Sequence, residues 1–325
     1  MIQKALDFIN KYTSFILSTH EIPDADGIGA EVLLAFILKK LGKKVKIINA
    51  MPIPVNFSFM DPKKITGTWN PAQHQSLLKK SALIILDTSD EYNIGKIRDE
   101  VLPDVLDVMV IDHHELSPLS ILDGYIDSTA ASTSEMIMAV ANAFNIVPDK
   151  ISSNAAFAGI VYDTGSFAYA KTNTNTFKAA LSLVENGVNP YKIYQELYES
   201  SSTGAVILQK IVLSTLEMHA NGQIAVQVLR KENLESTGTT IEDAEGFINL
   251  PLKSKDVKVS ILLKQSSQGL IRCSLRSKGA VNVAKIAQNF SGGGHATAAG
   301  FKSNLSIEKT LENLLNKVKS VLDKS

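Results

Sequence analysis

The sequence predicts an α/β protein in which a parallel sheet with helices on both faces is joined by a helical connector to a smaller α/β domain. Three observations support this fold class. Short apolar runs typical of buried strands alternate with helical patterns through the first part of the chain. The length of 325 residues is about twice that of a typical domain of ~150 residues. Residues 1–185 hold 16 basic and 21 acidic residues, whereas residues 186–325 hold 17 basic and 12 acidic. We therefore expect domains over 1–185 and 222–325, with the connector over 186–221.

The elements of the first domain follow from local patterns. A helix over 28–41 is expected to end at Gly42, and a helix over 133–144 has Ser132 or Thr133 as its N-cap. The other predicted elements are a first helix with Ile2, Leu6 and Ile9 on one face, strands at 15–17, 45–48, 83–86 and 108–111, a helical stretch over 157–162 that ends near Asp163, and helices over 175–186 and 190–200.

The second segment shows the patterns of a smaller α/β domain. Gly269 follows a polar stretch and precedes an apolar run, which marks a hairpin turn. The glycine triplet that ends at His295 is interpreted as a loop, and 296–299 as the start of a short helix whose N-terminus would favour anions. The other predicted elements are a helix over 204–219 in the connector, strands at 224–229, 257–263 and 270–275, and helices over 282–290 and 307–322.

The composition excludes several classes of protein. Cys273 is the single cysteine, so neither a disulfide framework nor a metal site with several thiolates can form within the chain. No apolar run approaches the ~18 residues that span a bilayer, and residues 1–20 lack a signal-peptide pattern, so a cytoplasmic protein without membrane contact is expected. Equal numbers of acidic and basic residues argue against a general attraction to long nucleic acids.

Potential metal ligands follow the predicted strands. Three of these strands lead into such a residue, and a further Asp ends the apolar stretch 157–162; in chain order the candidates are His20, Asp24, Asp26, Asp87, His113 and Asp163. A lone Asp after a strand is commonly a helix cap and a lone His is commonly structural, but their recurrence at one sheet edge indicates a shared site. Four carboxylates there would repel each other unless cations were bound. Carboxylate and imidazole ligands suit Mn²⁺ or Mg²⁺, and two such ions are the usual clamp for phosphoryl displacement.

These residues also carry a family resemblance. The pattern His20-x-x-Pro23-Asp24-x-Asp26-x-x-Gly29, followed by Asp87, Asp112-His113-His114 and Asp163, resembles the four motifs of the DHH phosphoesterases. Gly292-Gly293-Gly294-His295, together with Arg276, resembles the DHHA1 domain that accompanies them. The sequence is most similar to the NrnA-like branch, which contains oligoribonucleases and phosphatases of 3′-phosphoadenosine 5′-phosphate (pAp). The resemblance covers nearly the whole chain and also indicates a homodimer.

The resemblance implies a role for each motif residue. His20, Asp24 and Asp87 would hold one divalent ion, and Asp26, Asp87, His113 and Asp163 would hold the second, so that Asp87 bridges the two. The ions would be Mn²⁺, with Mg²⁺ or Co²⁺ as alternatives. His114 would face the substrate phosphate as a hydrogen-bond donor or acid, and Asp112 would fix the local loop or a histidine tautomer. If 24–26 were a regular strand, Asp24 and Asp26 would point to the same side, so serving different ions requires a loop there.

The second domain is predicted to bind the substrate. Arg272, Ser274 and Arg276 would share one face of a strand, and Arg276 could contact a phosphate through two N–H groups. A solvated surface side chain is an equally good interpretation of Arg272. Ser277 lies beside Arg276 and is a further candidate contact. The glycines Gly292, Gly293 and Gly294 would let the backbone approach a ligand closely, with His295 beside them.

The predicted function is hydrolysis of short RNA or DNA oligonucleotides, including pApA-type dinucleotides, to mononucleotides, with removal of the 3′-phosphate of pAp as a second activity. The motifs leave three alternatives open. A RecJ-like exonuclease would prefer long single-stranded DNA. A family II pyrophosphatase would share the first domain but would carry a different second domain. A nucleotide-binding sensor without activity would be expected to lack one of the metal ligands, whereas the set here is complete.

Overall fold

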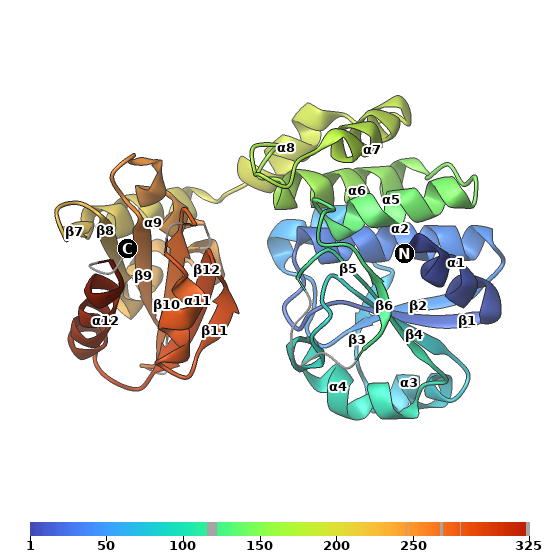
Figure 1. Cartoon of the computed structure of the whole chain (residues 1–325), viewed down its shortest axis with the longest axis horizontal. Coiled ribbons are helices and arrows are strands. Elements are labelled where there is room, and N and C mark those ends of the chain that lie inside the picture. Colours follow the sequence, from blue (N-terminus) through green and yellow to red (C-terminus); the bar gives the residue numbers. More distant parts are fainter. Residues whose placement is uncertain (116–121, 245, 267–268, 280, 323–325) are drawn as a thin grey trace. The chain divides into compact units, whose positions relative to one another are not determined.

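The computed structural model describes residues 1–115, 122–244, 246–266, 269–279 and 281–322, except for the side chain of His295. The chain divides into two compact units, Met1–Ser200 and Ser201–Ser325 (Figure 1). The division falls inside the segment predicted as a connector. Helix α8 (Pro190–Tyr198) packs on helix α6 (Lys150–Asp163) of the first unit, whereas α9 (Thr203–Ser214) belongs to the second.

The first unit contains the expected parallel sheet. Its strand order is β3-β2-β1-β4-β5-β6, and every neighbouring pair is parallel. The bounds are β1 Ser14–Ser18, β2 Lys44–Asn49, β3 Thr66–Thr68, β4 Ala82–Leu86, β5 Val108–Asp112 and β6 Gly124–Ile126. The edge strands β3 and β6 were not predicted, because three residues are too few to show an apolar pattern. In parallel sheets the carboxyl ends of the strands share one edge, and the candidate ligands follow them.

Helices cover both faces of this sheet, as the sequence predicted (Figure 1). One core contains Phe15 and Leu17 of β1 together with α1, α2, α5 and α6, and another contains Ile16 of β1 with Leu78 of α3 and Ile97 of α4. Successive residues of β1 therefore point to opposite faces. The helices are α1 Ile2–Lys11, α2 Ala25–Lys40, α3 Pro71–Leu78, α4 Lys96–Glu100, α5 Thr133–Ala143, α6 Lys150–Asp163, α7 Thr174–Glu185 and α8 Pro190–Tyr198.

The second unit is built on a mixed sheet of order β11-β12-β10-β9-β8-β7, in which only β8 and β9 pair in parallel. Its strands are β7 Glu217–His219, β8 Ile224–Leu229, β9 Val259–Gln265, β10 Ile271–Ser277, β11 Gly293–His295 and β12 Ala298–Ser303. Its helices are α9 Thr203–Ser214, α10 Lys231–Thr237, α11 Val283–Gln288 and α12 Ile307–Leu322. Among the described residues, no helix is long and apolar enough to cross a membrane.

Two predictions for the second unit were wrong. The helix expected over 204–219 ends at Ser214, because the Thr215 hydroxyl binds the backbone of Val228 and the chain then enters β7. The short helix expected at 296–299 is instead a turn that leads into β12. The backbone of β11 runs so close to β12 that a Cβ on Gly294 would lie 2.4 Å from the carbonyl oxygen of Ala298. The glycine-rich segment therefore forms an edge hairpin, and no helix N-terminus is available there for an anion.

Candidate metal centre

The six residues predicted as metal ligands come together at the carboxyl edge of the first unit's sheet. Two groups have ligand atoms that all lie within 4.8 Å of one another, His20 with Asp24 and Asp87, and Asp26 with His113 and Asp163. A third group of the same kind contains Asp87, His113 and His114. The residues of the two clusters come from four separate segments of the chain, and Asp87 lies where the clusters meet.

Asp87 has the geometry of a shared ligand. Its Oδ2 lies 3.7 Å from Nε2 of His20, and its Oδ1 lies 3.5 Å from Nε2 of His113. Oδ1 also accepts a hydrogen bond of 2.9 Å from the Thr133 hydroxyl. The residue directly follows β4 and has a φ of +65°, a left-handed conformation that Asp tolerates better than most side chains. A carboxylate offers two oxygens, so it can serve two ions where an imidazole serves one.

Asp26 is fully buried and is held by the first turn of α5. Its two oxygens accept hydrogen bonds from the backbone N–H groups of Thr133 and Ser134, at 2.6 and 2.9 Å. Gly159 of α6 makes room for this arrangement, because a Cβ there would lie 2.3 Å from the Ser134 hydroxyl and 2.9 Å from Asp26. A helix N-terminus favours a carboxylate, so α5 partly offsets the cost of burying this charge.

Asp24 and Asp26 belong to different clusters, but they lie at the start of a helix and not in the loop that the sequence predicts. Helix α2 begins at Ala25, three residues before the predicted start, so that Asp24 is its N-cap and Asp26 lies in its first turn. Oδ1 of Asp24 accepts from the backbone of Asp26 and Gly27 and lies 3.5 Å from Nε2 of His20. The change from extended to helical backbone turns the two carboxylates in different directions.

The electrostatics of the cluster favour bound cations. Burial, reinforced by the Asp87 charge, raises the pKa of Asp26 and also the pKa of Asp163. Burial alone would lower the pKa of His113, but its contact with Asp163 and the neighbouring carboxylates raise it to about 10. The His113 ring is buried, yet neither nitrogen has a partner in hydrogen-bond geometry among the described residues, although Asp163 Oδ2 lies 2.9 Å from Nε2. The His113 nitrogens thus lack hydrogen bonds while several carboxylates lie close to them. This arrangement fits a divalent ion bound by nitrogen and oxygen ligands.

His114 and Asp112 form a pair beside the cluster. Oδ1 of the buried Asp112 accepts from the backbone N–H of His114 at 3.1 Å and lies 2.7 Å from its Nδ1. Burial works against the charge on the ring, but the contact with Asp112 raises the pKa of His114. About a third of the His114 side chain is exposed. The carboxylate thus fixes the orientation of an imidazole whose Nε2 can face a substrate.

Three supporting residues were not identified from the sequence. Thr133, interpreted only as a helix start, contacts both Asp26 and Asp87. Lys171 donates from Nζ to the carbonyl oxygen of His113 at 3.0 Å. Asn49 ends β2 and accepts from the backbone N–H of Thr19, next to His20. The position of Asn49 at a strand end is the one signal in the sequence that points to this residue.

The predicted substrate-binding residues of the second unit lie on strand β10 and on or beside the edge strand β11. Arg272, Ser274 and Arg276 alternate with buried residues of β10 and share a face. Arg276 and His295 are both register partners of Ala298, so the backbone places them in one row across three strands. Ser277 lies on the opposite, buried face and donates to the carbonyl oxygen of Val281 at 2.6 Å, so it is not part of this surface.

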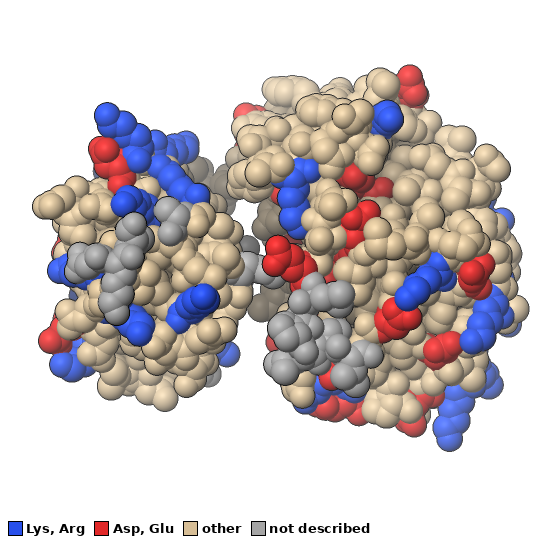
Figure 2. Space-filling view, in the orientation of Figure 1, with Lys and Arg blue, Asp and Glu red and all other residues tan. Residues whose placement is uncertain are grey.

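The glycine-rich segment lies at the edge of the same sheet. Gly292 precedes β11, which contains Gly293 and Gly294, and the His295 side chain lies outside the described structure. Basic side chains are prominent on the visible face of the second unit in Figure 2.

Comparisons with known proteins identify both units. A family model described as "DHH family, N-terminal domain" matches residues 14–163, and one described as "DHHA1 domain" matches residues 221–324. Two proteins named "Bifunctional oligoribonuclease and PAP phosphatase NrnA" are similar. The protein from Thermus thermophilus is 26% identical, covering 95% of this chain and 90% of its own length, and the one from Bacillus subtilis is 28% identical, covering 90% of each. A crystal structure of an exopolyphosphatase-related protein from Bacteroides fragilis has a TM-score of 0.89 at 24% identity, covering 99% of this chain and 95% of that one.

Proposed function

The chain belongs to the DHH family and carries a DHHA1 domain, as its motifs predicted, and from this premise we propose that it is a metal-dependent phosphoesterase acting on short oligonucleotides and on pAp. The similar NrnA proteins, which are named for these two activities, align with this chain over about nine-tenths of their lengths. The observation that carries the proposal is that Asp87, a member of the cluster with His20 and Asp24, also lies 3.5 Å from His113 of the other cluster.

The first unit supplies the reaction chemistry. His20, Asp24 and Asp87 would hold one divalent ion, and Asp26, Asp87, His113 and Asp163 the other, with Mn²⁺ as the ion that best suits this mixture of nitrogen and oxygen ligands. When bound, the two ions supply an activated water and offset the charge that develops on the phosphate. Hydrogen bonds from Thr133 and Ser134 hold the ligand carboxylates in place.

His114 would act on the leaving oxygen. Its Nδ1 contacts the Asp112 carboxylate at 2.7 Å, which leaves Nε2 directed away from that partner. Because the pKa of His114 is raised, the ring can hold a proton at Nε2 and transfer it to the leaving oxygen when the P–O bond breaks. Asp112 would act through His114 as a positioning residue.

The second unit would bind the remainder of the substrate. Arg276 and the row it forms with His295 are proposed to contact a terminal phosphate, and Arg272 extends the same face of β10. With two arginines on this face of β10, few phosphates would be contacted, which favours a short substrate over a long strand. Arg276→Ala would then raise KM for a dinucleotide at least tenfold, whereas Lys319→Ala, which removes an exposed cation from α12, would leave KM within about twofold.

The test is a substrate panel with Mn²⁺ that contains pAp, pApA, short RNA, long single-stranded DNA and pyrophosphate. We expect release of mononucleotides from pApA and short RNA, release of phosphate from pAp, and loss of all activity in the Asp112→Ala, His113→Ala double variant. Full activity in that variant would refute the assignment of the centre. A preference for long DNA would favour the RecJ-like alternative, and hydrolysis of pyrophosphate alone would favour the pyrophosphatase.

A further inference from the structure

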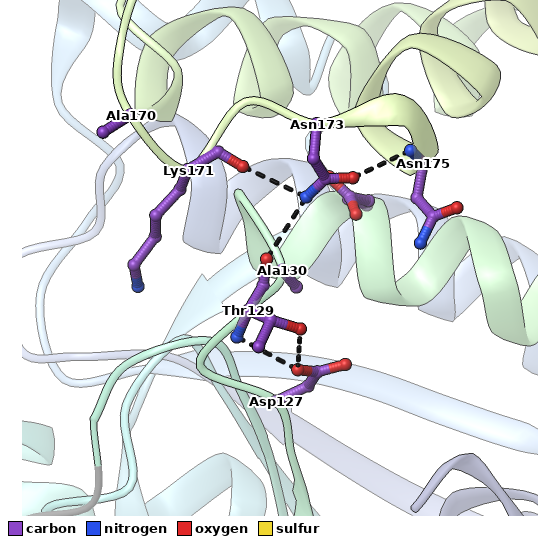
Figure 3. A pocket seen from close by; sticks show the side chains of 8 residues that line it. Asp127, Thr129, Ala130, Ala170, Lys171, Asn173 and Asn175 are labelled. Atoms are coloured by element: carbon purple, nitrogen blue, oxygen red, sulfur yellow. Dashed lines mark hydrogen bonds between the residues drawn. The ribbon is translucent and has the colours of Figure 1, made fainter.

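A polar slot lies beside the metal centre within the first unit. It is a cavity of about 450 Å³ between the segment that follows β6 and the segment that precedes α7 (Figure 3). Asn173 joins these two segments, because its Nδ2 donates to the carbonyl oxygen of Thr129 at 3.2 Å and its Oδ1 accepts from the backbone of Asn175 at 2.8 Å. The slot is therefore held open by the fold, and its volume falls in the range of small-molecule sites.

Two contacts connect the slot to the centre. Glu135, which lines the slot, lies in the same first turn of α5 as Thr133, which contacts Asp26 and Asp87. Lys171, on the other side of the slot, donates to the carbonyl oxygen of His113. A group bound in the slot would consequently lie beside the metal centre, against residues that contact it directly or through the same helical turn.

The free polar atoms of the slot define what it can bind. Glu135 is already engaged, since Oε2 accepts from the Thr176 hydroxyl at 2.7 Å, and Lys171 is engaged by His113. Oδ1 of Asp127 accepts from the backbone and hydroxyl of Thr129 at 3.0 and 2.6 Å, which fixes the carboxylate and leaves Oδ2 directed away from the turn (Figure 3). Neither this Oδ2 nor the side-chain amide of Asn175 has a hydrogen-bond partner in the described part of the chain.

These atoms favour a neutral group that carries N–H donors. Asp127 can only accept hydrogen bonds when ionised, whereas the Asn175 amide can both donate and accept. The lining carries two carboxylates, Asp127 and Glu135, against one cation, Lys171, and this excess of negative charge disfavours a phosphate. A nucleobase with an exocyclic amino group offers a donor to the carboxylate and an acceptor to the amide, and such edges are how proteins distinguish unpaired bases.

We propose that this slot binds a base of the substrate through Asp127 and Asn175 and prefers adenine, guanine and cytosine over uracil. Uracil has no amino group, and its one donor on the pairing edge, the ring N3–H, lies between two carbonyl oxygens that the carboxylate repels. The proposal rests on the proposed function, since it assigns the slot to the base beside the phosphate that is hydrolysed. It gives the first unit a part in substrate selection, which the motif residues alone do not provide.

Binding of free nucleosides tests the slot without any reaction. The full chain in EDTA is titrated with adenosine, guanosine, cytidine and uridine, and with inorganic phosphate, while saturation transfer from protein to ligand is measured by NMR. We expect the three nucleosides with amino groups to bind roughly tenfold more tightly than uridine, the size of effect expected for a hydrogen bond to a charged group. Inorganic phosphate, which has no proton signal of its own and is added as a competitor, should not reduce the signals of the nucleosides.

Asp127→Asn is the decisive variant. It keeps Oδ1 and the turn with Thr129 but replaces Oδ2 by an amide nitrogen, so the preference should shift toward uridine. Asn175→Ala should weaken all four nucleosides, and Asp123→Asn, which changes an exposed carboxylate paired with Lys4, should change none. Equal binding of all four nucleosides, or an unchanged preference in Asp127→Asn, would overturn the proposal.

Kinetics separate this proposal from the proposed function. With dinucleotides that differ in one base, Asp127→Asn should change the ratio of kcat/KM between them mainly through KM, while a substrate with an abasic site should be hydrolysed equally by both proteins. If the wild-type protein binds nucleosides with the expected preference but hydrolyses no oligonucleotide, the proposed function fails and the slot stands. If it hydrolyses dinucleotides with no dependence on Asp127, the slot proposal fails alone.

Discussion

Loss of Asp87 should abolish stabilisation by divalent ions, because this carboxylate belongs to one cluster and lies 3.5 Å from His113 of the other. The perturbation is Asp87→Asn, which keeps an oxygen for the Thr133 hydroxyl but removes the negative charge and one of the two oxygens that could bind an ion where the clusters meet. The metal-free variant should therefore stay folded, so that any change in ion binding reports on the centre.

The magnitude follows from the distances in the centre. Asp26 and Asp163 have ligand oxygens within 4.8 Å of each other, and two full charges at that separation repel by roughly 3 to 4 kcal/mol at an effective dielectric constant of ~20. A divalent ion between them reverses this repulsion. An ion present at ~100 times its Kd stabilises the folded protein by about 2.7 kcal/mol, which corresponds to roughly 5 to 10 °C in Tm for a unit of this size.

The assay is thermal unfolding in EDTA and in millimolar Mn²⁺, combined with elemental analysis of the bound metal. We expect the wild-type Tm to rise by roughly 5 to 10 °C for each ion bound, and the shift in Asp87→Asn to fall below about 2 °C. Asp104→Asn, which changes an exposed carboxylate outside the clusters, is the matched control and should keep the full shift. An equal shift in wild type and Asp87→Asn, or no shift in wild type with Mn²⁺, Mg²⁺ or Co²⁺, would refute the reasoning.

Three further predictions concern residues around the centre and the core. Gly159→Ala should lower the free energy of unfolding by about 1 to 3 kcal/mol and weaken Mn²⁺ binding, since the new methyl group meets the Ser134 hydroxyl; unchanged Mn²⁺ affinity would contradict the packing argument. Burial raises the pKa of Glu31 to about 8, so its neutral form stabilises the fold at low pH and this contribution is lost as the pH rises from ~4.5 to 8; Glu31→Gln should flatten that part of the stability profile measured in EDTA. Trp69→Phe removes the 2.7 Å hydrogen bond from Nε1 to Glu100 and should cost about 1 to 3 kcal/mol in urea unfolding; a neutral result would show that the bond contributes nothing net.

Much of the first unit could be predicted because its signals are local. The apolar runs at β1, β4 and β5 are buried along nearly their whole length, so they need apolar side chains throughout and stand out in a sequence. Strand β2 is buried only over its last three residues, but its run of Ile47 and Ile48 is also apolar. Strands β3 and β6 were not predicted, because each has three residues and depends on a neighbouring strand for its hydrogen bonds. The early start of α2 is not predicted from the sequence, because Asp24 is interpreted there as a metal ligand and not as the helix cap.

The second unit shows why pattern alone is insufficient. The segment after the glycine triplet is rich in Ala, which favours helices, yet it forms β12 because both β10 and β11 supply hydrogen-bond partners for it. Ser277 was grouped with Arg276 because it is adjacent in sequence, but adjacent strand residues face opposite sides, and Ser277 turns into the core. In both cases contacts from distant segments outweighed the local preference.

By itself, the sequence determined the family, the parallel sheet and the residue types at the carboxyl ends of its strands, because these depend on short motifs and on the buried pattern of single strands. Only the tertiary structure decided which ligands lie together, that Asp87 stands between two clusters, and that the N-terminus of α5 holds Asp26. It also formed the slot between two segments more than forty residues apart, joined by Asn173. The reason is that a site needs distances between side chains, and those distances exist only after the strands have been aligned and the helices packed over them.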